Sequence, residues 1–560
     1  MSDAPAPLRV LVVGGTGAFG ERLVAGLLAT TGFDVLVAGR NEQRLDTLVG
    51  RCNGPGGRAR AASLALDALN VTADTLRATG AFAVVDAAGP YQGGDHRLAQ
   101  AAIAAGLHTI DLADARDFVA GFTALDAAAK AAGVVALTGA SSTPALSNAA
   151  LDTLTAGWSR VERVEIAIAP GNRAPRGLSV VRSILSYAGR PVRVLTDGRW
   201  GERPGWGMTV RREMPGLGRR WLSLSETPDL DIVPGRFRVG RSAVFRAGLE
   251  LPVLHLGLLL ASLPVRAGML RSLAPLARPL RAVAVALKPF GADRGGMTVE
   301  AVGLDAAGRP VRGLWFLVAE GGDGPCVPIL PALAALRALA DGRLARTGAS
   351  ACVGVLTLGE IEAEFRELRI TSGLRFERPA PSLYEGVLGA AFLLLPKPLR
   401  GLHRPGWEMR AHGLARVDGP DGPLARLVAA TFRFPPPTEE VLVSVEIAAV
   451  SGEERWVRDF GGRRFASRLS ASGTPGRLVE RFGPLAFELD LLTGPEGVLG
   501  MPVRAWQLGP LPLPRALAPV SVATERVDEK GRFRFDVELR LPLGLGRLVR
   551  YRGWLVPSTG

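Results

Sequence analysis

The chain of 560 residues is poor in the residue types that build disulfide, metal and lysine-based sites. Its three cysteines, Cys52, Cys326 and Cys352, match no metal or redox spacing, which favours a reducing, cytoplasmic setting. Its five histidines include no pair at metal-ligand spacing, so no metal site is expected. Only four of its 67 basic residues are lysine, and this bias, together with abundant Ala, Gly and Pro, indicates GC-rich coding rather than nucleic-acid binding.

Long hydrophobic runs are also missing. The first residues, MSDAPAPLR, contain no apolar stretch, so no signal peptide is expected. The longest apolar run, at 251–265, has 15 residues, fewer than the ~20 that a bilayer-spanning helix needs. A hydrophobic content of 47% nevertheless excludes a disordered chain, and the length allows three or four domains.

The most informative segment is LRVLVVGGTGAFGERLVAGLL, residues 8–28. A short apolar strand at 10–13 enters a glycine-rich turn, and a helical pattern follows. Glycines permit a tight turn and a close approach to a pyrophosphate, which the N–H groups at the helix start attract. The pattern therefore predicts a dinucleotide site, against the alternative of an ordinary strand–helix turn. The predicted binding turn comprises Gly14, Gly15, Thr16, Gly17, Ala18, Phe19 and Gly20.

The second predicted strand ends in Arg40 and Asn41, where NAD sites place an acidic residue for the ribose 2′-OH. Asp34 lies at the start of that strand, so its carboxylate is misplaced for this role. A guanidinium at Arg40 suits a 2′-phosphate, which favours NADP(H) over NAD. The alternative is a solvated arginine that precedes the helix NEQRLDTL.

Alternating apolar strands and helices over the first 150 residues predict a parallel sheet covered on both faces. The carboxyl ends of its strands face the cofactor, which adds Ala88, Gly89 and Pro90 to the predicted cofactor contacts. Weak candidates for proton transfer near this edge are Tyr91, His96 and Asp111. The alternatives are a tight turn at 89–90, a helix cap at Asp111 and a partly exposed helix residue at His96.

Several motifs resemble the NADP-binding domain of the saccharopine-dehydrogenase-like oxidoreductases. They are GGTGAFG, VAGRNEQRL, AVVDAAGPYQGGDHRLAQAAIAAGLHTIDLAD, GASSTPALSNAALD and a stretch that begins GGMTVEAVGLDAAGRPVRGLWF. The resemblance covers roughly residues 8–372. It implies a Rossmann domain at 1–150 and a mixed α/β domain at 151–376 of the substrate or dimerisation type, which makes a homodimer an expectation.

The last third, 378–560, resembles a domain of unknown function appended to some bacterial members of that family. Residues 533–541 and 485–491 alternate apolar and polar side chains, which predicts antiparallel strands with one apolar face. The stretch 384–403 is expected to be helical, and PAPS at 379–382 reads as a linker. The chain is therefore expected to be α/β, with a Rossmann domain, a mixed α/β domain and a β-rich C-terminal domain.

Positive charge concentrates in one segment. Residues 160–290 contain 22 basic and 9 acidic residues, a net charge of +13, whereas residues 1–150 have 11 and 13. The apolar run at 251–265 lies inside this segment and is followed by spaced basic residues, a pattern typical of an interfacial amphipathic segment. We therefore expect contact of 251–290 with the inner face of a membrane, against the alternative of a buried interdomain helix.

Together these observations predict an NADP(H)-dependent oxidoreductase of the saccharopine-dehydrogenase-like type that acts on a small or lipid-like substrate. Two alternatives stay open. One is a non-catalytic NADP(H)-binding protein, because no acid–base pair stands out. The other is a membrane-surface or lipid-binding module, favoured by residues 251–290 and by the apolar face of the C-terminal strands.

Overall fold

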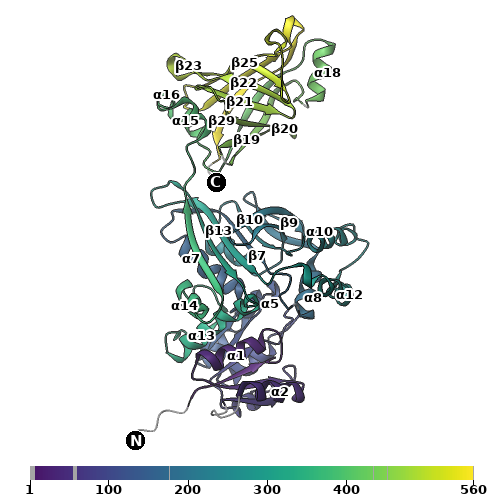
Figure 1. The fold of residues 1–560 in the computed structure, drawn as a ribbon. Helices are drawn as coiled ribbons and strands as arrows, with labels where there is room; N and C mark the ends of the chain where they lie inside the picture. Colours follow the sequence, from purple (N-terminus) through teal and green to yellow (C-terminus); the bar gives the residue numbers. More distant parts are fainter. Residues whose placement is uncertain (1–6, 54–59, 176, 433, 451, 559–560) are drawn as a thin grey trace. The chain divides into compact units, whose positions relative to one another are not determined.

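The computed structural model describes residues 7–53, 60–175, 177–432, 434–450 and 452–558. The chain divides into two compact units, residues 1–377 and residues 378–560, which Figure 1 draws as ribbons. Among the described helices, none combines the length and the apolarity that crossing a membrane requires.

The first unit contains the parallel sheet that the strand–helix alternation predicts, with strand order β15-β6-β5-β4-β1-β2-β3. Its strands are short, and the inner ones are largely buried because helices cover both faces, whereas the edge strands β3 and β15 are more exposed. The strands are β1 (Arg9–Val13), β2 (Asp34–Gly39), β3 (Ala61–Ala65), β4 (Ala83–Asp86), β5 (His108–Asp111), β6 (Val135–Thr138) and β15 (Gly348–Ala351). The helices are α1 (Gly20–Thr30), α2 (Glu42–Asn53), α3 (Ala73–Arg77), α4 (Arg97–Ala104), α5 (Arg116–Gly121), α6 (Asp126–Ala131), α7 (Ser147–Leu154), α13 (Leu330–Ala340) and α14 (Leu358–Glu362).

One strand of this sheet comes from much later in the chain. β15 pairs in parallel with β6, and Gly348 and Ala351 lie opposite Val135 and Thr138. The helix before it, α13, contacts α1 and is buried along most of its length. A first domain that ended at residue 150 would lack this strand and this helix, because the chain returns to the sheet after building a second one.

The second sheet of this unit is mixed, with strand order β10-β11-β12-β7-β13-β14-β16, and β8 and β9 are attached to β12. β7 and β12 are parallel, and the other neighbours are antiparallel. The strands are β7 (Arg160–Ala169), β8 (Pro191–Thr196), β9 (Arg199–Pro204), β10 (Val210–Met214), β11 (Gly218–Leu224), β12 (Ser242–Ala247), β13 (Gly295–Leu304), β14 (Pro310–Ala319) and β16 (Ile370–Glu377). Its helices are α8 (Leu178–Tyr187), α9 (Asp229–Arg236), α10 (Pro252–Ala261), α11 (Leu263–Arg266) and α12 (Ala277–Ala286).

The second unit is β-rich, as the alternating pattern predicts. Its sheet runs in the order β23-β24-β27-β28-β29-β17-β18-β19-β20-β21-β22-β25-β26. The strands are β17 (Glu408–Asp418), β18 (Thr438–Val450), β19 (Glu453–Phe460), β20 (Arg463–Ala471), β21 (Arg477–Phe482), β22 (Leu485–Asp490), β23 (Leu492–Thr493), β24 (Leu499–Gly500), β25 (Val503–Leu508), β26 (Leu511–Pro512), β27 (Val520–Val527), β28 (Phe533–Arg540) and β29 (Arg547–Pro557).

This sheet closes on itself. β22 continues into β23 with only Leu491 between them, β23 pairs with β24, and β24 pairs with β27. The continuous chain from β22 to β23 therefore links the two sides of the sheet, and the alternating apolar side chains form a common interior. Four short helices flank the sheet, α15 (Leu383–Leu388), α16 (Ala391–Leu394), α17 (Lys397–Leu402) and α18 (Pro423–Thr431).

The stretch 384–403 is divided among three of these helices instead of forming one. Gly389 has a φ of +55°, a conformation that ends α15. Pro396 then interrupts the run, and α17 begins at Lys397. The segment is therefore helical as expected, but Gly389 and Pro396 divide it into three short helices.

Candidate functional site

The glycine turn between β1 and α1 packs against the loop that follows β4. Gly14 has a φ of +77°, and a Cβ there would lie 2.7 Å from the Cα of Ala88. A Cβ on Gly20 would lie 2.2 Å from the carbonyl oxygen of Gly14, and one on Gly15 would lie 2.4 Å from a Val37 methyl group. Only glycine fits these three positions, so the turn brings β1, β4 and α1 into close contact.

Gly17 differs from these three glycines. A Cβ there would meet the Gly14 carbonyl oxygen at 3.1 Å and the Ala87 carbonyl oxygen at 3.9 Å, so this position is less crowded. Among the described residues, no acceptor takes a hydrogen bond from the N–H groups of Thr16, Ala18 or Phe19. Unpaired N–H groups before an 11-residue helix are the donors that a pyrophosphate requires. The turn therefore fits a dinucleotide.

The end of β2 places two arginines beside this turn. Arg40 is exposed and makes no ion pair with a described residue. Asn41 accepts a hydrogen bond from the Arg44 N–H at 2.9 Å, so its side chain caps α2. Arg44 donates from Nη2 to the Thr16 carbonyl oxygen at 3.1 Å, which holds its guanidinium over the glycine turn. The sequence reasoning missed Arg44, although its place one helical turn after Arg40 was visible.

The predicted loop after β4 is held by its own hydrogen bonds. Asp86 Oδ1 accepts from the Ala88 N–H at 2.8 Å, and the Tyr91 hydroxyl donates to the Asp86 carbonyl oxygen at 2.8 Å. Burial raises the pKa of Asp86 to about 6 and the pKa of Tyr91 well above its usual value. Gly89 and Pro90 lie in this loop between Ala88, which packs against Gly14 of the glycine turn, and Tyr91. The buried, bonded phenol of Tyr91 is poorly suited to proton exchange with a substrate.

His96 and Asp111 are likewise engaged by the protein. His96 Nε2 lies 2.9 Å from the Phe118 carbonyl oxygen, and its ring packs edge-on against Phe118. Asp111 Oδ1 accepts from the N–H groups of Ala113 and Gly139 at 2.9 and 2.8 Å. Burial raises the pKa of Asp111 to about 7, although these hydrogen bonds act to lower it. The contacts of both residues hold loops together, and their roles in proton transfer stay predictions.

A second polar group lies where the first sheet's edge meets α8. Gln92 Nε2 donates to Ser183 Oγ at 2.7 Å and to Asp114 Oδ1 at 3.3 Å. Asp114 follows β5 and is exposed, yet desolvation by the surrounding protein raises its pKa, while the bond from Gln92 lowers it. Tyr187 also lies on α8, and burial, with a smaller contribution from the Asp114 charge, raises its pKa. Its hydroxyl shares a hydrogen bond of 2.7 Å with the Ser225 hydroxyl. We define Gln92, Asp114, Ser183 and Tyr187 as the α8 cluster.

The α8 cluster combines residues that no local pattern links. Asp114 follows β5, whereas Ser183 and Tyr187 lie about 70 residues later in the chain, so the sequence gives no local signal that joins them. An exposed carboxyl group with a raised pKa beside the predicted cofactor edge makes Asp114 a candidate proton carrier.

A buried carboxyl group fastens the loop after β6 to the second sheet's helix α9. Asp229 accepts hydrogen bonds from Ser147 Oγ at 2.7 Å, from Asn148 Nδ2 at 2.9 Å and from the Thr143 hydroxyl. Burial raises its pKa to about 7. Its surroundings are fully buried, so Asp229 is a structural anchor of the SSTPALSN segment. In the described ranges, no cluster of three or more His, Cys, Asp or Glu could hold a metal ion.

The parallel sheet with helices on both faces defines the first unit as one that contains a Rossmann-like α/β domain. The family described as "Domain of unknown function (DUF4166)" matches residues 395–555, within the closed sheet. No curated protein matches the chain in a sequence search.

Solved structures that resemble the chain include dehydrogenases and reductases. One is apo saccharopine dehydrogenase (L-Glu forming) from Saccharomyces cerevisiae, at 12% identity and a TM-score of 0.49, covering 66% of this chain and all of that one. Another is the FolM alternative dihydrofolate reductase 1 from Brucella suis in complex with NADP, at 17% identity and a TM-score of 0.20. It covers 23% of this chain and 73% of its own.

Proposed function

We propose that the first unit is an NADP(H)-dependent oxidoreductase of the saccharopine-dehydrogenase-like type. The observation that carries this proposal is the glycine turn, with three N–H groups that no described residue uses and two arginines at the end of β2. These N–H groups bind the pyrophosphate, and Arg40 and Arg44 bind the 2′-phosphate as paired guanidinium groups. The substrate stays unassigned beyond a small or lipid-like molecule.

The chain's own residues provide orientation and a proton in this proposal. A bound nicotinamide supplies hydride chemistry, which belongs to the cofactor. Asp114 holds the proton that accompanies this chemistry, and Gln92 fixes its carboxyl group through the 3.3 Å hydrogen bond. Ala88, Gly89 and Pro90 form the loop against which the cofactor's reactive end rests. Asp229 keeps the loop after β6 in place without touching substrate.

Cofactor choice tests the two arginines. Wild-type protein should bind NADPH more tightly than NADH, as measured by fluorescence titration. Arg40→Asp should cost about 1.5–3 kcal/mol of NADPH binding and bring the two affinities together, because a charge-assisted phosphate contact is lost. Arg44→Asp should act in the same direction. The matched control Arg97→Asp, on α4, should retain the wild-type ratio. Equal affinities in the wild type would refute the assignment of Arg40.

Turnover tests Asp114. Asp114→Asn should lower turnover of any accepted substrate and remove the descending limb of the pH profile, where Asp114 loses its proton as pH rises, while NADPH affinity stays unchanged. Because the pKa of Asp114 is raised, that limb should lie above the pH at which an ordinary aspartate titrates. Unchanged turnover in Asp114→Asn would refute this role. Tight NADPH binding without turnover over a broad substrate panel would favour a non-catalytic NADP(H)-binding protein.

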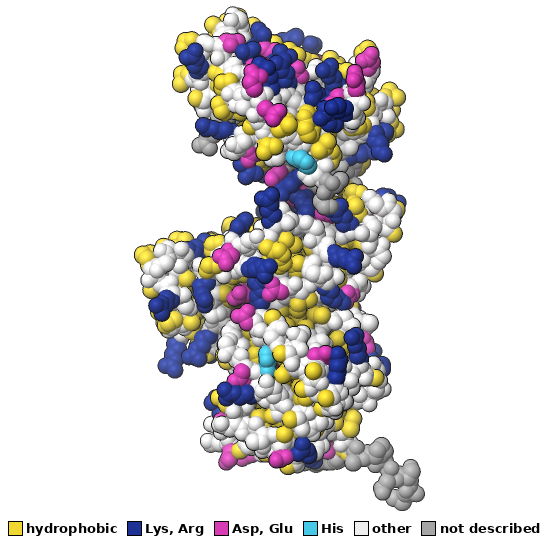
Figure 2. Space-filling view, turned by 180° about the vertical axis from the view of Figure 1, so that it is seen from behind, with side chains coloured by type: hydrophobic (Ala, Val, Ile, Leu, Met, Phe, Trp, Pro, Cys, Tyr) yellow, Lys and Arg dark blue, Asp and Glu magenta, His cyan; other side chains and the backbone are white. Residues whose placement is uncertain are grey.

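We also propose that residues 251–290 attach the protein to an anionic membrane surface. Apolar side chains of this segment are exposed, with Val253 and Leu260 at 65%, Met269 at 71% and Phe290 at 74%. They share the surface with arginines and a lysine. Figure 2 shows hydrophobic and basic side chains together on the part of the first unit that projects to the left, where α10 and α12 lie. Exposed apolar groups beside cations fit an interface rich in anionic headgroups.

Sedimentation with vesicles tests this attachment. The protein should bind phosphatidylserine-containing vesicles more tightly than phosphatidylcholine vesicles, and binding should fall as salt rises. Arg271→Glu together with Arg278→Glu should weaken it, whereas the control Arg97→Glu should not. If wild-type protein ignores both vesicle types and is instead a dimer that Val253→Asp dissociates, the segment is a contact between copies of the chain.

A further inference from the structure

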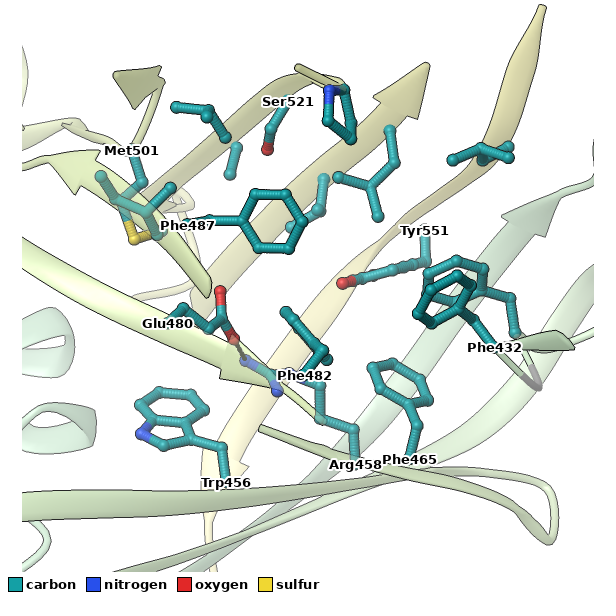
Figure 3. A pocket seen from close by; sticks show the side chains of 18 of the residues that line it. Phe432, Trp456, Arg458, Phe465, Glu480, Phe482, Phe487, Met501, Ser521 and Tyr551 are labelled. Carbon is teal, nitrogen blue, oxygen red and sulfur yellow. Dashed lines mark hydrogen bonds and ion pairs between the residues drawn. The ribbon is translucent and has the colours of Figure 1, made fainter. Parts of the chain in front are cut away.

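The closed sheet of the second unit encloses a cavity of about 430 Å³, within the ~300–1,000 Å³ typical of small-molecule sites. Its wall consists almost entirely of aliphatic and aromatic side chains, with only Arg458, Glu480, Ser521 and Glu525 charged or carrying an aliphatic hydroxyl. Figure 3 shows these side chains converging from several strands. A packed protein interior leaves few voids larger than a water molecule, so a space of this size is a feature to be explained.

One end of the cavity is sealed by the helices that precede the sheet. Tyr384 of α15 stacks on His403 just after α17, with ring centroids 3.8 Å apart. His403 Nε2 lies 2.6 Å from Glu525 Oε2, and both side chains are buried. Tyr384 and Glu525 line the cavity. The buried pair of His403 Nε2 and Glu525 Oε2 therefore closes this end.

The opposite end has an exposed apolar rim. Strand register places Phe460 and Phe465 toward the turn between β19 and β20, away from Trp456. Phe432 follows α18, and Leu517 precedes β27, and both line the cavity while remaining 37% and 46% exposed. Leu427 on α18 is 68% exposed. An apolar rim at the end opposite the seal is where an apolar molecule can enter.

Between these ends the wall carries one fixed charged pair. Arg458 Nη1 donates to Ser467 Oγ at 2.9 Å, and Nη2 donates to Glu480 Oε1 at 3.3 Å. The guanidinium also lies over the ring of Trp456 at 5.2 Å, and each side chain of the pair is only 16% exposed. Figure 3 shows the pair at the cavity wall. Both charges are held in place before any ligand arrives.

The pair leaves hydrogen-bonding capacity toward the cavity. Among the described residues, no donor reaches Glu480 Oε2 and no partner pairs with the Tyr551 hydroxyl. Figure 3 shows the Tyr551 oxygen directed into the space between the strands. The wall thus offers one carboxylate acceptor and one hydroxyl donor, the complement of an alcohol, which both donates and accepts.

The charges near this position select against an anion. Glu480 neutralises Arg458, and Glu525 adds a further carboxyl group toward the sealed end. A ligand carboxylate here would be buried beside these groups without an unpaired cation, which is costly in an apolar cavity. An uncharged hydroxyl meets the same groups at little cost.

We propose that the closed sheet of residues 378–560 binds an uncharged, elongated apolar molecule whose single polar end is a hydroxyl group. The chain of the ligand lies along the aromatic wall, and its hydroxyl donates to Glu480 and accepts from Tyr551. This site is independent of the dinucleotide turn and stands whether or not the first unit is an oxidoreductase.

The first test is competition on the full-length protein. N-phenyl-1-naphthylamine, an uncharged apolar fluorophore, should bind saturably. Decan-1-ol should displace it with an affinity at least about ten-fold higher than decanoate at pH 7, because the carboxylate meets no free cation. Absence of saturable probe binding would overturn the proposal, and stronger displacement by decanoate would overturn the hydroxyl assignment.

Two variants place the binding inside the cavity. Ala523→Phe adds a ring to the cavity wall and should abolish displaceable probe binding while circular dichroism stays that of the wild type. If this variant does not fold, Ser521→Phe, closer to the rim, tests the same space. Probe binding unchanged in a folded cavity variant would place the fluorophore elsewhere, for instance on 251–290, and would overturn the proposal.

A charge-removing variant tests the selectivity. Glu480→Gln leaves Arg458 without its counter-charge, so decanoate should gain affinity and the preference for decan-1-ol should fall by about ten-fold or reverse. The matched control is Glu446→Gln on β18, whose carboxylate pairs with Arg410 at 3.1 Å on the outer face. It should keep the wild-type preference. An unchanged preference in Glu480→Gln would overturn the role of the pair.

Discussion

The two proposed binding regions of this chain are built in opposite ways. The dinucleotide turn is made by neighbouring residues, and its recognition groups are backbone N–H groups whose positions follow from Gly14 and Gly20. The cavity of the closed sheet takes Arg458, Ser467 and Glu480 from three successive strands, and its recognition groups are side chains. A backbone site tolerates changes of most side chains near it, whereas a side-chain site depends on strand register at every polar position.

The largest expected effect separates folding from binding within the glycine turn. Gly20→Val should unfold or strongly destabilise the first unit, because a Cβ 2.2 Å from the Gly14 carbonyl oxygen cannot be accommodated. Gly17→Val should leave the unit folded, since a Cβ at this position would lie 3.1 Å from its nearest neighbour, the Gly14 carbonyl oxygen. It should nevertheless abolish binding of NADPH and NADH, because the side chain crowds the pyrophosphate. Thermal unfolding and dinucleotide titration measure the two effects. NADPH binding by Gly17→Val would show that the turn does not hold the pyrophosphate.

The same contrast explains what could be predicted from the sequence. Apolar strands, glycine spacing and Arg40 are local signals, and they predicted the parallel sheet and the position of the turn. The alternation in 485–491 and 533–541 predicted antiparallel strands with one apolar face. It could not predict closure, because closure depends on the two-residue pairings β23–β24 and β24–β27 between distant segments.

Distant partners account for the remaining differences. The return of β15 to the first sheet, the Gln92–Ser183 bond of the α8 cluster and the bonds of Asp229 to Ser147 and Asn148 all join residues more than 80 positions apart. Arg44 is the exception. It lies four residues after Arg40 at the start of a helix, so helical spacing alone could have included it.

The next largest effect concerns the sealed end of the closed sheet. His403→Ala should lower the free energy of unfolding of the second unit by about 3 kcal/mol or more, because it removes a buried ring and leaves Glu525 without its 2.6 Å partner. His412→Ala, at an exposed position, should change it by less than about 0.5 kcal/mol. Urea unfolding followed by tryptophan fluorescence measures both. Equal effects would mean that the seal is not a buried pair.

A smaller effect is expected at the anchor of the first unit. Asp229→Ala removes the acceptor shared by Ser147, Asn148 and Thr143, and leaving such buried donors unpaired costs about 1–3 kcal/mol. The raised pKa gives this anchor a pH dependence. Its folded pKa of about 7 lies above the ordinary value of 3.8, so its ionisation makes wild-type stability fall as pH rises between these values. Asp229→Ala should flatten that slope in thermal melts taken from pH 4 to pH 8.

The smallest effect separates the inner and outer faces of the closed sheet. Arg550 donates two hydrogen bonds to Asp536, at 2.9 and 2.8 Å, which is a better geometry than the 3.3 Å contact of Arg458 with Glu480. The outer pair is about one-third exposed, however, so water and salt screen it. Arg550→Ala should therefore cost at most about 1 kcal/mol, and probe binding in the cavity should stay unchanged. Arg458→Ala should instead increase the preference for decan-1-ol over decanoate, because the Glu480 carboxylate loses its cation and then repels a second buried anion. If the two variants changed stability and selectivity alike, geometry rather than enclosure would set the strength of these pairs, and the cavity would hold no special polar site.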